Sequence, residues 1–358
     1  MSNKEVFFLA EAGVNHNGEK EKAFALVEVA AAAGADAVKF QTFNAEKLAA
    51  TRAPKAAYQK KLTDHQESQL EMLRKLELPL EWHAPLKKHA ESLGIQFLST
   101  AFDVDSLQFL QTLDLSVYKI PSGEIVNAPL LWHFARTGKP LILSTGMATL
   151  GEIEQALAVL SYGMSYVEPP KNFSEIWSFW SSEKAQQQVR DKITLLHCTS
   201  QYPTPMEEVN LKAMNTLGDA FGMKVGYSDH TEGDLIAIAA VAKGAVLIEK
   251  HFTLDRHLPG PDHAASLEPS ELKHLISQIR ALSKALGSGI KAPQPSEWDT
   301  RRAARQNIIA SRDIAVGEVF SVENITTARA GGGRSPMEWW DVLQGESATK
   351  NMMAGDPL

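Results

Sequence analysis

The sequence is poor in cysteine and has no long apolar run. Its 358 residues include one cysteine, Cys198, which excludes a disulfide within the chain and is typical of a reducing compartment. No apolar run approaches the roughly 20 residues of a membrane-spanning helix. Near the start, Phe7–Ala10 is too short for the core of a secretory signal, and Glu11 follows it at once. We therefore expect a cytoplasmic protein with no membrane partner.

An excess of positive charge is also missing. The chain has 36 Lys and Arg against 43 Asp and Glu, for a formal net charge of -7. This balance argues against nucleic acid or an acidic membrane surface as the partner, so an anionic substrate would need local basic side chains. The 44% hydrophobic and 22% charged residues are typical of a globular protein long enough for more than one domain.

Eight short apolar runs alternate with amphipathic stretches in the first 287 residues. Most runs are apolar throughout, as strands buried on both faces are. Between them lie helical patterns such as Glu19–Ala33, which stops at Gly34, and a capping box at Thr149 and Glu152. Eight such rounds predict a (β/α)8 TIM barrel over residues 1–287, with a doubly wound open sheet as the alternative. The expected strands are Val6–Ala12, Ala37–Phe43, Gln96–Phe102, Val117–Ser122, Leu141–Thr145, Ile193–Ser200, Lys224–Asp229 and Val246–Phe252.

Three segments depart from this repeat. The connection over residues 48–80 is long and charged, and residues 161–192 are about 30 residues where a short loop would do, which predicts an inserted helical flap or contact surface. Residues 288–300, with glycine and two prolines, are expected to be a linker. Beyond it, Ser311–Phe320 and Thr349–Leu358 echo each other position for position. They predict a small β-rich domain over residues 301–358, with internal pseudo-symmetry, that docks on a partner surface.

Two histidines mark a candidate metal site. His230 and His251 each follow a β-type run, Lys224–Tyr227 and Val246–Ile248. If these runs are neighbouring parallel strands, both imidazoles lie at one mouth and can bind a divalent metal. The alternative is two unrelated polar residues at strand ends. We expect four more polar groups in the same mouth, from Ser228, Asp229, Lys250 and Asp262.

Two lysines interrupt otherwise apolar strands. Lys39 lies in V-K-F and Lys119 in Y-K-I. A lysine inside a barrel must find a partner or lose its charge, and an anionic ligand such as a phosphate, cradled by serine and threonine hydroxyls, would be such a partner. Two alternatives remain open: the lysines pair with carboxylates inside the barrel, or one of them forms a Schiff base as in a metal-independent aldolase.

Long motifs carry a resemblance to a known family. They include A-E-A-G-V-N-H-N-G (10–18), G-A-D-A-V-K-F-Q-T-F (34–43), L-S-T-A-F-D (98–103), Y-K-I-P-S-G-E (118–124), L-S-T-G-M-A (143–148), L-L-H-C-T-S (195–200), G-Y-S-D-H-T (226–231) and E-K-H-F-T-L (249–254). With them the chain resembles the sialic acid synthase family, which includes N-acetylneuraminate, legionaminate and pseudaminate synthases and spore-coat polysaccharide relatives. Residues 301–358 resemble its antifreeze-like (SAF, β-clip) domain.

The resemblance implies a transferase for surface polysaccharide biosynthesis. Such an enzyme condenses phosphoenolpyruvate with the open-chain aldehyde of an N-acylated, ManNAc-like hexosamine and gives a nonulosonic acid and phosphate. It implies Mn²⁺ or Mg²⁺ on His230 and His251, with Glu11 moving the proton beside the reacting carbon. The implied phosphoenolpyruvate-binding residues are Lys39, Thr100, Lys119, Ser122, Ser144, Ser200 and Ser228. The implied sugar-side residues are Gln41, Glu124, Tyr202, Asp262 and Arg329.

The resemblance also implies a domain-swapped homodimer in which the small domain of one subunit caps the barrel of the other and supplies Arg329 toward the N-acyl group. Three departures bear on sugar specificity. Ser200 stands where many members have Asn, the cap turn reads A-R-A-G-G-G where the family has K-R-P-G-x-G, and residues 161–192 are an unusual insertion. The alternatives are a Schiff-base aldolase on the same barrel and a non-enzymatic sugar-binding or ice-binding protein.

Overall fold

The computed structural model describes residues 5–50, 53–56, 59–60 and 67–358. By contacts between Cα atoms the chain divides into two compact units, which meet in sequence between Ser288 and Gly289. In the described part, no helix is long and apolar enough to span a membrane. The cytoplasmic location expected from the sequence stays a prediction.

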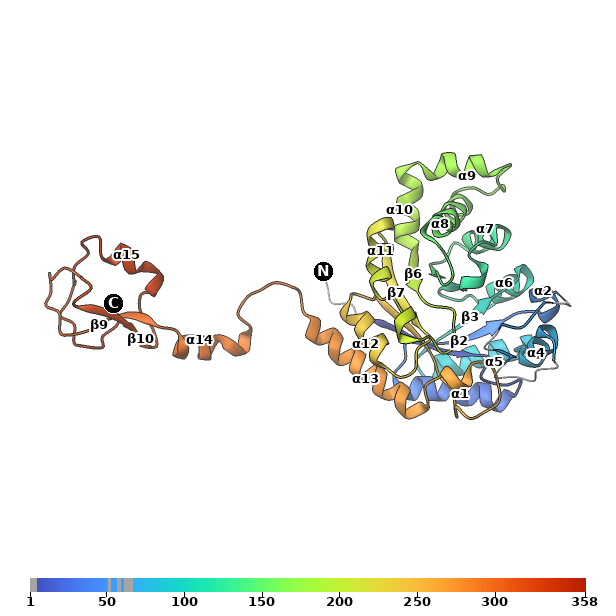
Figure 1. Cartoon of the computed structure of the whole chain (residues 1–358), viewed down its shortest axis with the longest axis horizontal. Helices are drawn as coiled ribbons and strands as arrows, with labels where there is room; N and C mark the ends of the chain where they lie inside the picture. The colour runs from blue at the N-terminus through green and yellow to red at the C-terminus, as the bar shows by residue number, and fades with distance from the viewer. Residues whose placement is uncertain (1–4, 51–52, 57–58, 61–66) are drawn as a thin grey trace. The chain divides into compact units, whose positions relative to one another are not determined.

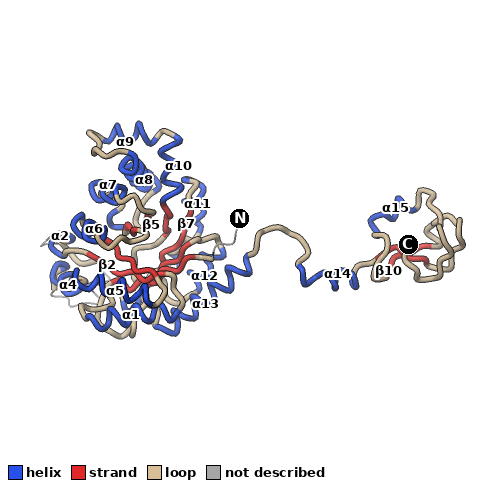
Figure 2. Tube along the Cα trace, turned by 180° about the vertical axis from the view of Figure 1, so that it is seen from behind, coloured by secondary structure: helices blue, strands red, loops and turns tan. Residues whose placement is uncertain are grey.

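The first unit is a closed barrel of eight parallel strands (Figures 1 and 2). Each strand pairs with the next along the chain, and β8 pairs with β1 to close the barrel. The predicted TIM barrel is therefore confirmed, and the doubly wound open sheet is wrong. The strands are β1 (Phe7–Gly13), β2 (Ala37–Thr42), β3 (Gln96–Ala101), β4 (Tyr118–Ile120), β5 (Leu141–Ser144), β6 (Ile193–His197), β7 (Lys224–Asp229) and β8 (Leu247–His251).

Amphipathic helices surround this sheet and shield its outer face (Figure 1). The helix α1 ends at Gly34, whose left-handed backbone (φ 87°) lets its N–H bond back to the carbonyls of Ala30 and Ala31. The capping box predicted at Thr149 is present at the start of α8. The helices of this unit are α1 (Lys20–Ala33), α2 (Ala45–Leu48), α4 (Gln69–Leu76), α5 (Leu80–Ser92), α6 (Val104–Gln111), α7 (Ala128–Arg136), α8 (Leu150–Ser165), α9 (Phe173–Trp180), α10 (Glu183–Lys192), α11 (Lys212–Phe221), α12 (Leu235–Ala242) and α13 (Pro269–Leu286).

The barrel interior consists of an apolar layer below a polar one. Successive side chains of a strand point to opposite faces, so residues two apart line the same side. An apolar cluster plugs the barrel, made of Phe7, Leu9, Ala37, Leu98, Val117, Ile142, Leu196 and Leu247. Two positions further along each strand come Glu11, Lys39, Thr100, Lys119, Ser144, Cys198, Ser228 and Glu249, which line one cavity. The plug closes the cavity from below, and the chemistry is confined to the carboxyl ends of the strands.

The unusual segment after β5 begins later than the sequence predicts. Ser161 lies inside α8, which continues to Ser165, and two further helices, α9 and α10, lead to β6. Both helices pack on α8 at the outside of the barrel (Figure 1). The segment is therefore helical, as expected, but its first five residues are the last turns of the regular helix.

The second unit, Gly289–Leu358, contains α14 (Trp298–Ala304), the antiparallel strands β9 (Asn307–Ala310) and β10 (Ile325–Ala328), and the short helix α15 (Trp339–Val342). The predicted small β-rich fold is confirmed. Its two echoing segments pair through equivalent residues, Ile314 with Met352. Asp313 Oδ1 accepts from the Ala354 N–H at 2.9 Å, and Asn351 Oδ1 accepts from the Val316 N–H at 2.8 Å, so the two halves repeat one contact.

Candidate active site

The cavity at the carboxyl ends of the barrel strands has a volume of about 450 Å³. It brings together most residues that the sequence singles out. The predicted site residues that line it are Glu11, Lys39, Gln41, Thr100, Lys119, Ser122, Ser144, Ser200, Tyr202, Ser228, His230, His251 and Asp262. These residues come from all eight strands or the segments that follow them, which is how TIM-barrel enzymes build their sites.

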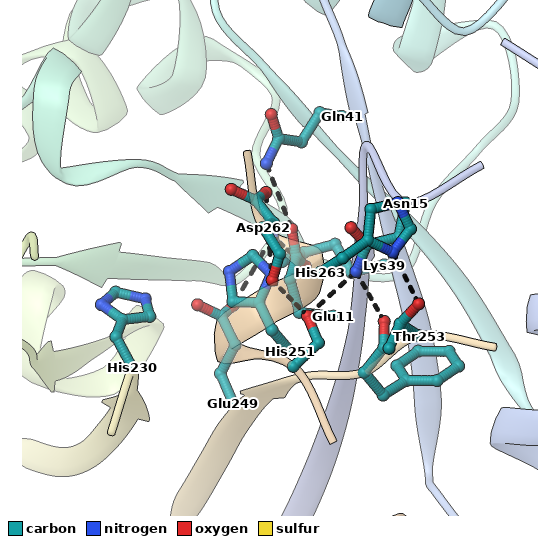
Figure 3. Close-up of polar contacts among 12 residues, drawn as sticks. Glu11, Asn15, Lys39, Gln41, His230, Glu249, His251, Thr253, Asp262 and His263 are labelled. Atoms are coloured by element: carbon teal, nitrogen blue, oxygen red, sulfur yellow. Dashed lines mark hydrogen bonds and ion pairs between the residues drawn. The ribbon is translucent and has the colours of Figure 1, made fainter. Parts of the chain in front are cut away.

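Two lysines and two carboxylates form a buried charge network at the floor of the cavity, and Figure 3 shows Lys39 with Glu11 and Glu249. The Nζ atom of Lys39 lies 2.6 Å from Glu11 Oε2 and 3.6 Å from Glu249 Oε2, and it donates to Thr100 Oγ1 at 2.9 Å. The Nζ atom of Lys119 lies 3.3 Å from Glu249 Oε1. The structure thus pairs the barrel lysines with internal carboxylates, which is one of the alternatives that the sequence leaves open.

The pKa values of the two carboxyl groups in this network are shifted in opposite directions. Although burial raises the pKa of Glu249, the ammonium groups of Lys119 and Lys39 hold it well below its usual range. Burial raises the pKa of Glu11 to about 7, with the charge of Glu249 adding to the effect and Lys39 opposing it. Burial lowers the pKa of Lys119. The cavity therefore contains one firmly ionised carboxylate and one carboxyl group that exchanges a proton near neutral pH.

Serine hydroxyls and a glycine form a small cradle in the cavity that Lys119 also lines. Ser122 Oγ accepts a hydrogen bond from the Gly146 N–H at 3.0 Å. A Cβ atom added to Gly146 would lie 2.5 Å from Ser200 Oγ and 2.9 Å from Ser122 Oγ, so only glycine leaves this space open. Ser144 Oγ is buried and has no hydrogen-bond partner among the described residues. Convergent hydroxyls beside a lysine are suited to binding phosphate oxygens.

The two histidines lie side by side, as the sequence predicts for neighbouring strand ends. The ring centroids of His230 and His251 are 5.6 Å apart, and the Tyr202 ring lies 4.1 Å from that of His230 between centroids, with the two rings tilted by 33°. Burial lowers the pKa of both histidines, and each also feels nearby charged groups, so both are neutral at pH 7. His230 Nδ1 donates to the Thr199 carbonyl at 2.7 Å, which leaves Nε2 as the lone-pair nitrogen.

These features fit a divalent metal. A metal-binding histidine usually donates its other ring N–H to a carbonyl or carboxylate, as His230 does. Within the described residues, the buried Nδ1 of His251 has no hydrogen-bond partner, and it lies 3.8 Å from Asp262 Oδ2. Burial raises the pKa of Asp262 to about 6. No three His, Cys, Asp or Glu side chains of the described chain are grouped as a complete protein-only metal site, so substrate or water would complete the coordination.

Three residues lie elsewhere than the sequence suggests. Asp229 and Lys250 do not reach the mouth, because each is the strand neighbour of an inward-facing histidine and so points out of the barrel. They form a fully buried ion pair at 2.9 Å. Glu124 is not among the residues that line the cavity, and it accepts from Asn127 Nδ2 at 2.6 Å. Arg329 belongs to the second unit, as the sequence predicts, and is exposed there, while its contact with a partner's barrel stays a prediction.

The sequence reasoning missed Glu249, Cys198 and an apolar part of the cavity. Glu249 precedes His251 by two positions in the same strand, so the strand period alone places both side chains on one side. Cys198 lies two positions beyond Leu196 by the same rule and contacts Ser122 Oγ through Sγ at 3.3 Å. The apolar part comes from the connection between β2 and β3, which has no comparable period.

Comparison with known proteins identifies the family. The NeuB family matches residues 26–291 and the SAF domain matches residues 305–358. N,N'-diacetyllegionaminic acid synthase of Campylobacter jejuni is 51% identical over 97% of both chains, and the enzyme of that name from Legionella pneumophila is 45% identical over 98% of this chain and 93% of its own.

A solved structure points the same way. N-acetylneuraminic acid synthetase from Leptospira borgpetersenii, in complex with citrate, is 33% identical and superposes with a TM-score of 0.69 over 83% of this chain and 90% of its own. The predicted resemblance and the predicted enzyme class, a synthase of the sialic acid synthase type, are therefore confirmed. The chain belongs to the NeuB family and carries a SAF domain at its C-terminal end.

Proposed function

We propose that this synthase condenses phosphoenolpyruvate with the open-chain aldehyde of an N-acylated hexosamine to give a nonulosonic acid and phosphate. The observation that carries the proposal is the single cavity in which two buried lysines and a hydroxyl cradle lie beside a pair of neutral histidines. The names of the relatives from Campylobacter jejuni and Legionella pneumophila support a nonulosonic acid as the product.

In this reaction Lys39 and Lys119 bind the anionic groups of phosphoenolpyruvate, and the hydroxyls of Ser122, Ser144 and Ser200 hold its phosphate oxygens. In the structure Lys39 pairs with Glu11 and Lys119 pairs with Glu249. Bound phosphoenolpyruvate would replace part of these contacts, because its anionic groups can pair with the same ammonium groups. A buried charge stays paired in both states, so the network is preorganised for an anion without the cost of two unpaired ammonium groups.

Carbon–carbon bond formation needs a proton at the aldehyde oxygen. The enol carbon C3 attacks the aldehyde carbon, and the carbonyl π electrons move to its oxygen. We assign proton donation there to Glu11, whose pKa of about 7 keeps a large share of it protonated near neutral pH. Water then adds at C2, and the C2–O bond breaks as phosphate leaves.

His230 and His251 are the proposed ligands of a divalent metal, with Mn²⁺ preferred over Mg²⁺ because imidazole is a borderline-soft ligand. When bound, the metal would supply Lewis acidity at the aldehyde oxygen. Three further residues line the cavity: Gln41, which donates to Glu11 Oε1 at 3.4 Å, Tyr202 and Asp262. They would orient the hexosamine so that its aldehyde carbon faces the enol.

The test is phosphate release from phosphoenolpyruvate across a panel of N-acylated hexosamines, with and without chelator and added Mn²⁺. We expect release only with both substrates and metal, and loss of activity in His251→Ala, with the thermal melt of the metal-free protein nearly unchanged. Covalent trapping of a keto acid by borohydride, with activity that survives chelator, would instead support a Schiff-base aldolase.

We also propose that the protein is a domain-swapped homodimer in which residues from about 300 onward cap the partner's barrel and present Arg329 to the N-acyl group. The exposure of Arg329 and its place beside a glycine-rich turn support this proposal. Mixing inactive His251→Ala with inactive Arg329→Ala subunits should restore activity in heterodimers, since half of their sites pair an intact barrel with an intact cap. Heterodimers that form and stay inactive would contradict the swap or the role of Arg329.

A further inference from the structure

The single cysteine of the chain lies in the proposed phosphate cradle, and the proposed reaction gives it no role. Cys198 follows β6 directly and is buried, with 5% of its surface exposed. It lines the same cavity as the serines that are proposed to bind phosphate. Its Sγ atom lies 3.3 Å from Ser122 Oγ, in a hydrogen bond in which either atom can be the donor. The thiol is therefore placed to act on Ser122.

Three consecutive strands converge on the cradle. Ser122 follows β4 and Gly146 follows β5, while Cys198 and Ser200 follow β6. A Cβ atom added to Gly146 would lie close to three polar atoms, at 2.9 Å from Ser122 Oγ, 3.0 Å from Cys198 Sγ and 2.5 Å from Ser200 Oγ. These atoms therefore surround one small space. Ser144 Oγ lines the same cavity and is buried without a partner in the described chain, and a buried hydroxyl of this kind needs one. A ligand with several acceptor oxygens would complete the cradle.

The hydroxyl of Ser122 can make three hydrogen bonds, one as a donor and two as an acceptor. The Gly146 N–H already occupies one acceptor position, at 3.0 Å. When the S–H of Cys198 occupies the other, the one proton of the Ser122 hydroxyl has to point in the remaining direction. Ser122 lines the cavity, and its hydroxyl has no third partner among the residues that the structure describes. Its proton is then free for an oxygen atom of the ligand.

The protonation state of Cys198 permits this direction of the hydrogen bond. Burial raises the pKa of the Cys198 thiol, and Ser122 and Lys119 oppose that rise only in part. The thiol therefore keeps its proton at neutral pH and can donate it. A thiolate at this place could not donate, and its charge would repel a phosphate. Without any donor here, the hydroxyl of Ser122 could rotate, and part of its hydrogen bond to the ligand would be lost.

We propose that Cys198 is a positioning residue for phosphoenolpyruvate: its S–H donates to Ser122 Oγ and so directs the Ser122 proton at an oxygen atom of the bound phosphate. The proposal rests on the proposed function, because it names a further residue of that same site. Cys198 acts through Ser122 and forms no covalent bond in the reaction. Its loss should therefore weaken the binding of phosphoenolpyruvate and leave the KM for the sugar nearly unchanged.

The test measures the dissociation constant of phosphoenolpyruvate by isothermal titration calorimetry on the full chain with Mn²⁺ present, so it does not depend on which sugar the enzyme uses. We expect Cys198→Ala to weaken binding about three- to tenfold, as the loss of one hydrogen bond does. Cys198→Ser, which restores a donor, should recover most of the affinity. Ser122→Ala should weaken binding at least as much as Cys198→Ala. Adding Cys198→Ala to Ser122→Ala should cause no further loss, because the thiol acts through that hydroxyl.

Ser161→Ala is the matched control. Ser161 Oγ is buried and donates to the Ala185 carbonyl at 2.9 Å, between α8 and α10, and it does not line the cavity. This variant also loses a buried hydrogen bond, yet its affinity for phosphoenolpyruvate should stay at the wild-type value. An unchanged dissociation constant in Cys198→Ala, or an equal further loss when Ser122→Ala is already present, would overturn the role of Cys198. If Cys198→Ala does not fold, a loss of about tenfold in Cys198→Ser would overturn it as well. No binding of phosphoenolpyruvate to the wild-type protein would overturn the proposed function itself, and this proposal with it.

Discussion

Replacing Glu249 by Gln removes one charge from the buried network and keeps nearly the same shape. Its carboxylate lies 3.3 Å from the ammonium of Lys119 and 3.6 Å from that of Lys39. At an effective dielectric constant of about 20, each of these contacts corresponds to an attraction of about 5 kcal/mol. Desolvation offsets much of that sum, and breaking one partner of a buried ion pair typically costs about 3–5 kcal/mol. We expect Glu249→Gln to lower the free energy of unfolding of the ligand-free protein by that amount.

Phosphoenolpyruvate should return part of this loss, because its anionic groups can replace the missing carboxylate beside the lysines. A ligand at 100 times its dissociation constant raises the unfolding free energy by about 2.7 kcal/mol. At a fixed ligand concentration the gain should be larger for Glu249→Gln than for the wild type. Urea unfolding with and without phosphoenolpyruvate measures both quantities.

The matched control is Glu19→Gln, which breaks an exposed pair with Lys22 at 2.7 Å. An exposed pair contributes about 0–1 kcal/mol, and phosphoenolpyruvate should not change that figure. The reasoning fails if Glu249→Gln loses less than about 1 kcal/mol. It also fails if the ligand stabilises the variant and the wild type equally.

Three further predictions concern groups around the same cavity. The pKa of Glu11 in the free enzyme is raised to about 7, so its acid form is lost as the pH rises through that value and kcat/KM for phosphoenolpyruvate should fall above about pH 7. Glu11→Gln should remove that decline from the pH profile, and a decline that persists would assign it to another group. Gly146→Ala puts a Cβ atom 2.5 Å from Ser200 Oγ, inside the proposed phosphate cradle. It should raise the KM for phosphoenolpyruvate about tenfold with little change in melting temperature. An unchanged KM would show that the cradle does not bind phosphate. Lys250→Met leaves the buried carboxylate of Asp229 without its lysine and should lower the unfolding free energy, measured by urea titration, by about 3–5 kcal/mol. Adding Asp229→Leu should recover most of that loss. A loss below about 1 kcal/mol in Lys250→Met would contradict a buried charged pair.

The barrel could be predicted from the sequence because its signals are local. Each strand is a short apolar run bounded by a polar segment, and eight of them in order leave few other topologies. The same regularity placed His230, His251, Lys39 and Lys119 at strand ends. The predicted bounds of the strands are confirmed only in part: β7 covers the predicted Lys224–Asp229, whereas β4 covers only Tyr118–Ile120 of the predicted Val117–Ser122.

Polarity alone does not show which residues near a strand end face the cavity, because successive side chains point to opposite sides of the strand. Asp229 and Lys250 are as polar as their neighbours, yet the strand period points them away from the cavity and into a buried ion pair. Glu249 has the opposite parity and lies between two lysines. The strand period was sufficient to separate these cases. The apolar part of the cavity follows from no strand period, because it depends on how the helices between β2 and β3 pack against one another.

The charge network links anion binding to the state of the general acid. In the ligand-free protein Lys39 lies 2.6 Å from Glu11 and opposes the rise in its pKa that burial causes. An anion that binds Lys39 draws that positive charge into a second pair and adds negative charge nearby, and both effects favour the protonated form of Glu11. Phosphoenolpyruvate would therefore convert Glu11 to its acid form as it binds. The proton needed at the sugar aldehyde oxygen is then in place before the sugar arrives, and Glu11 has no role as an acid until the first substrate fills the floor of the cavity.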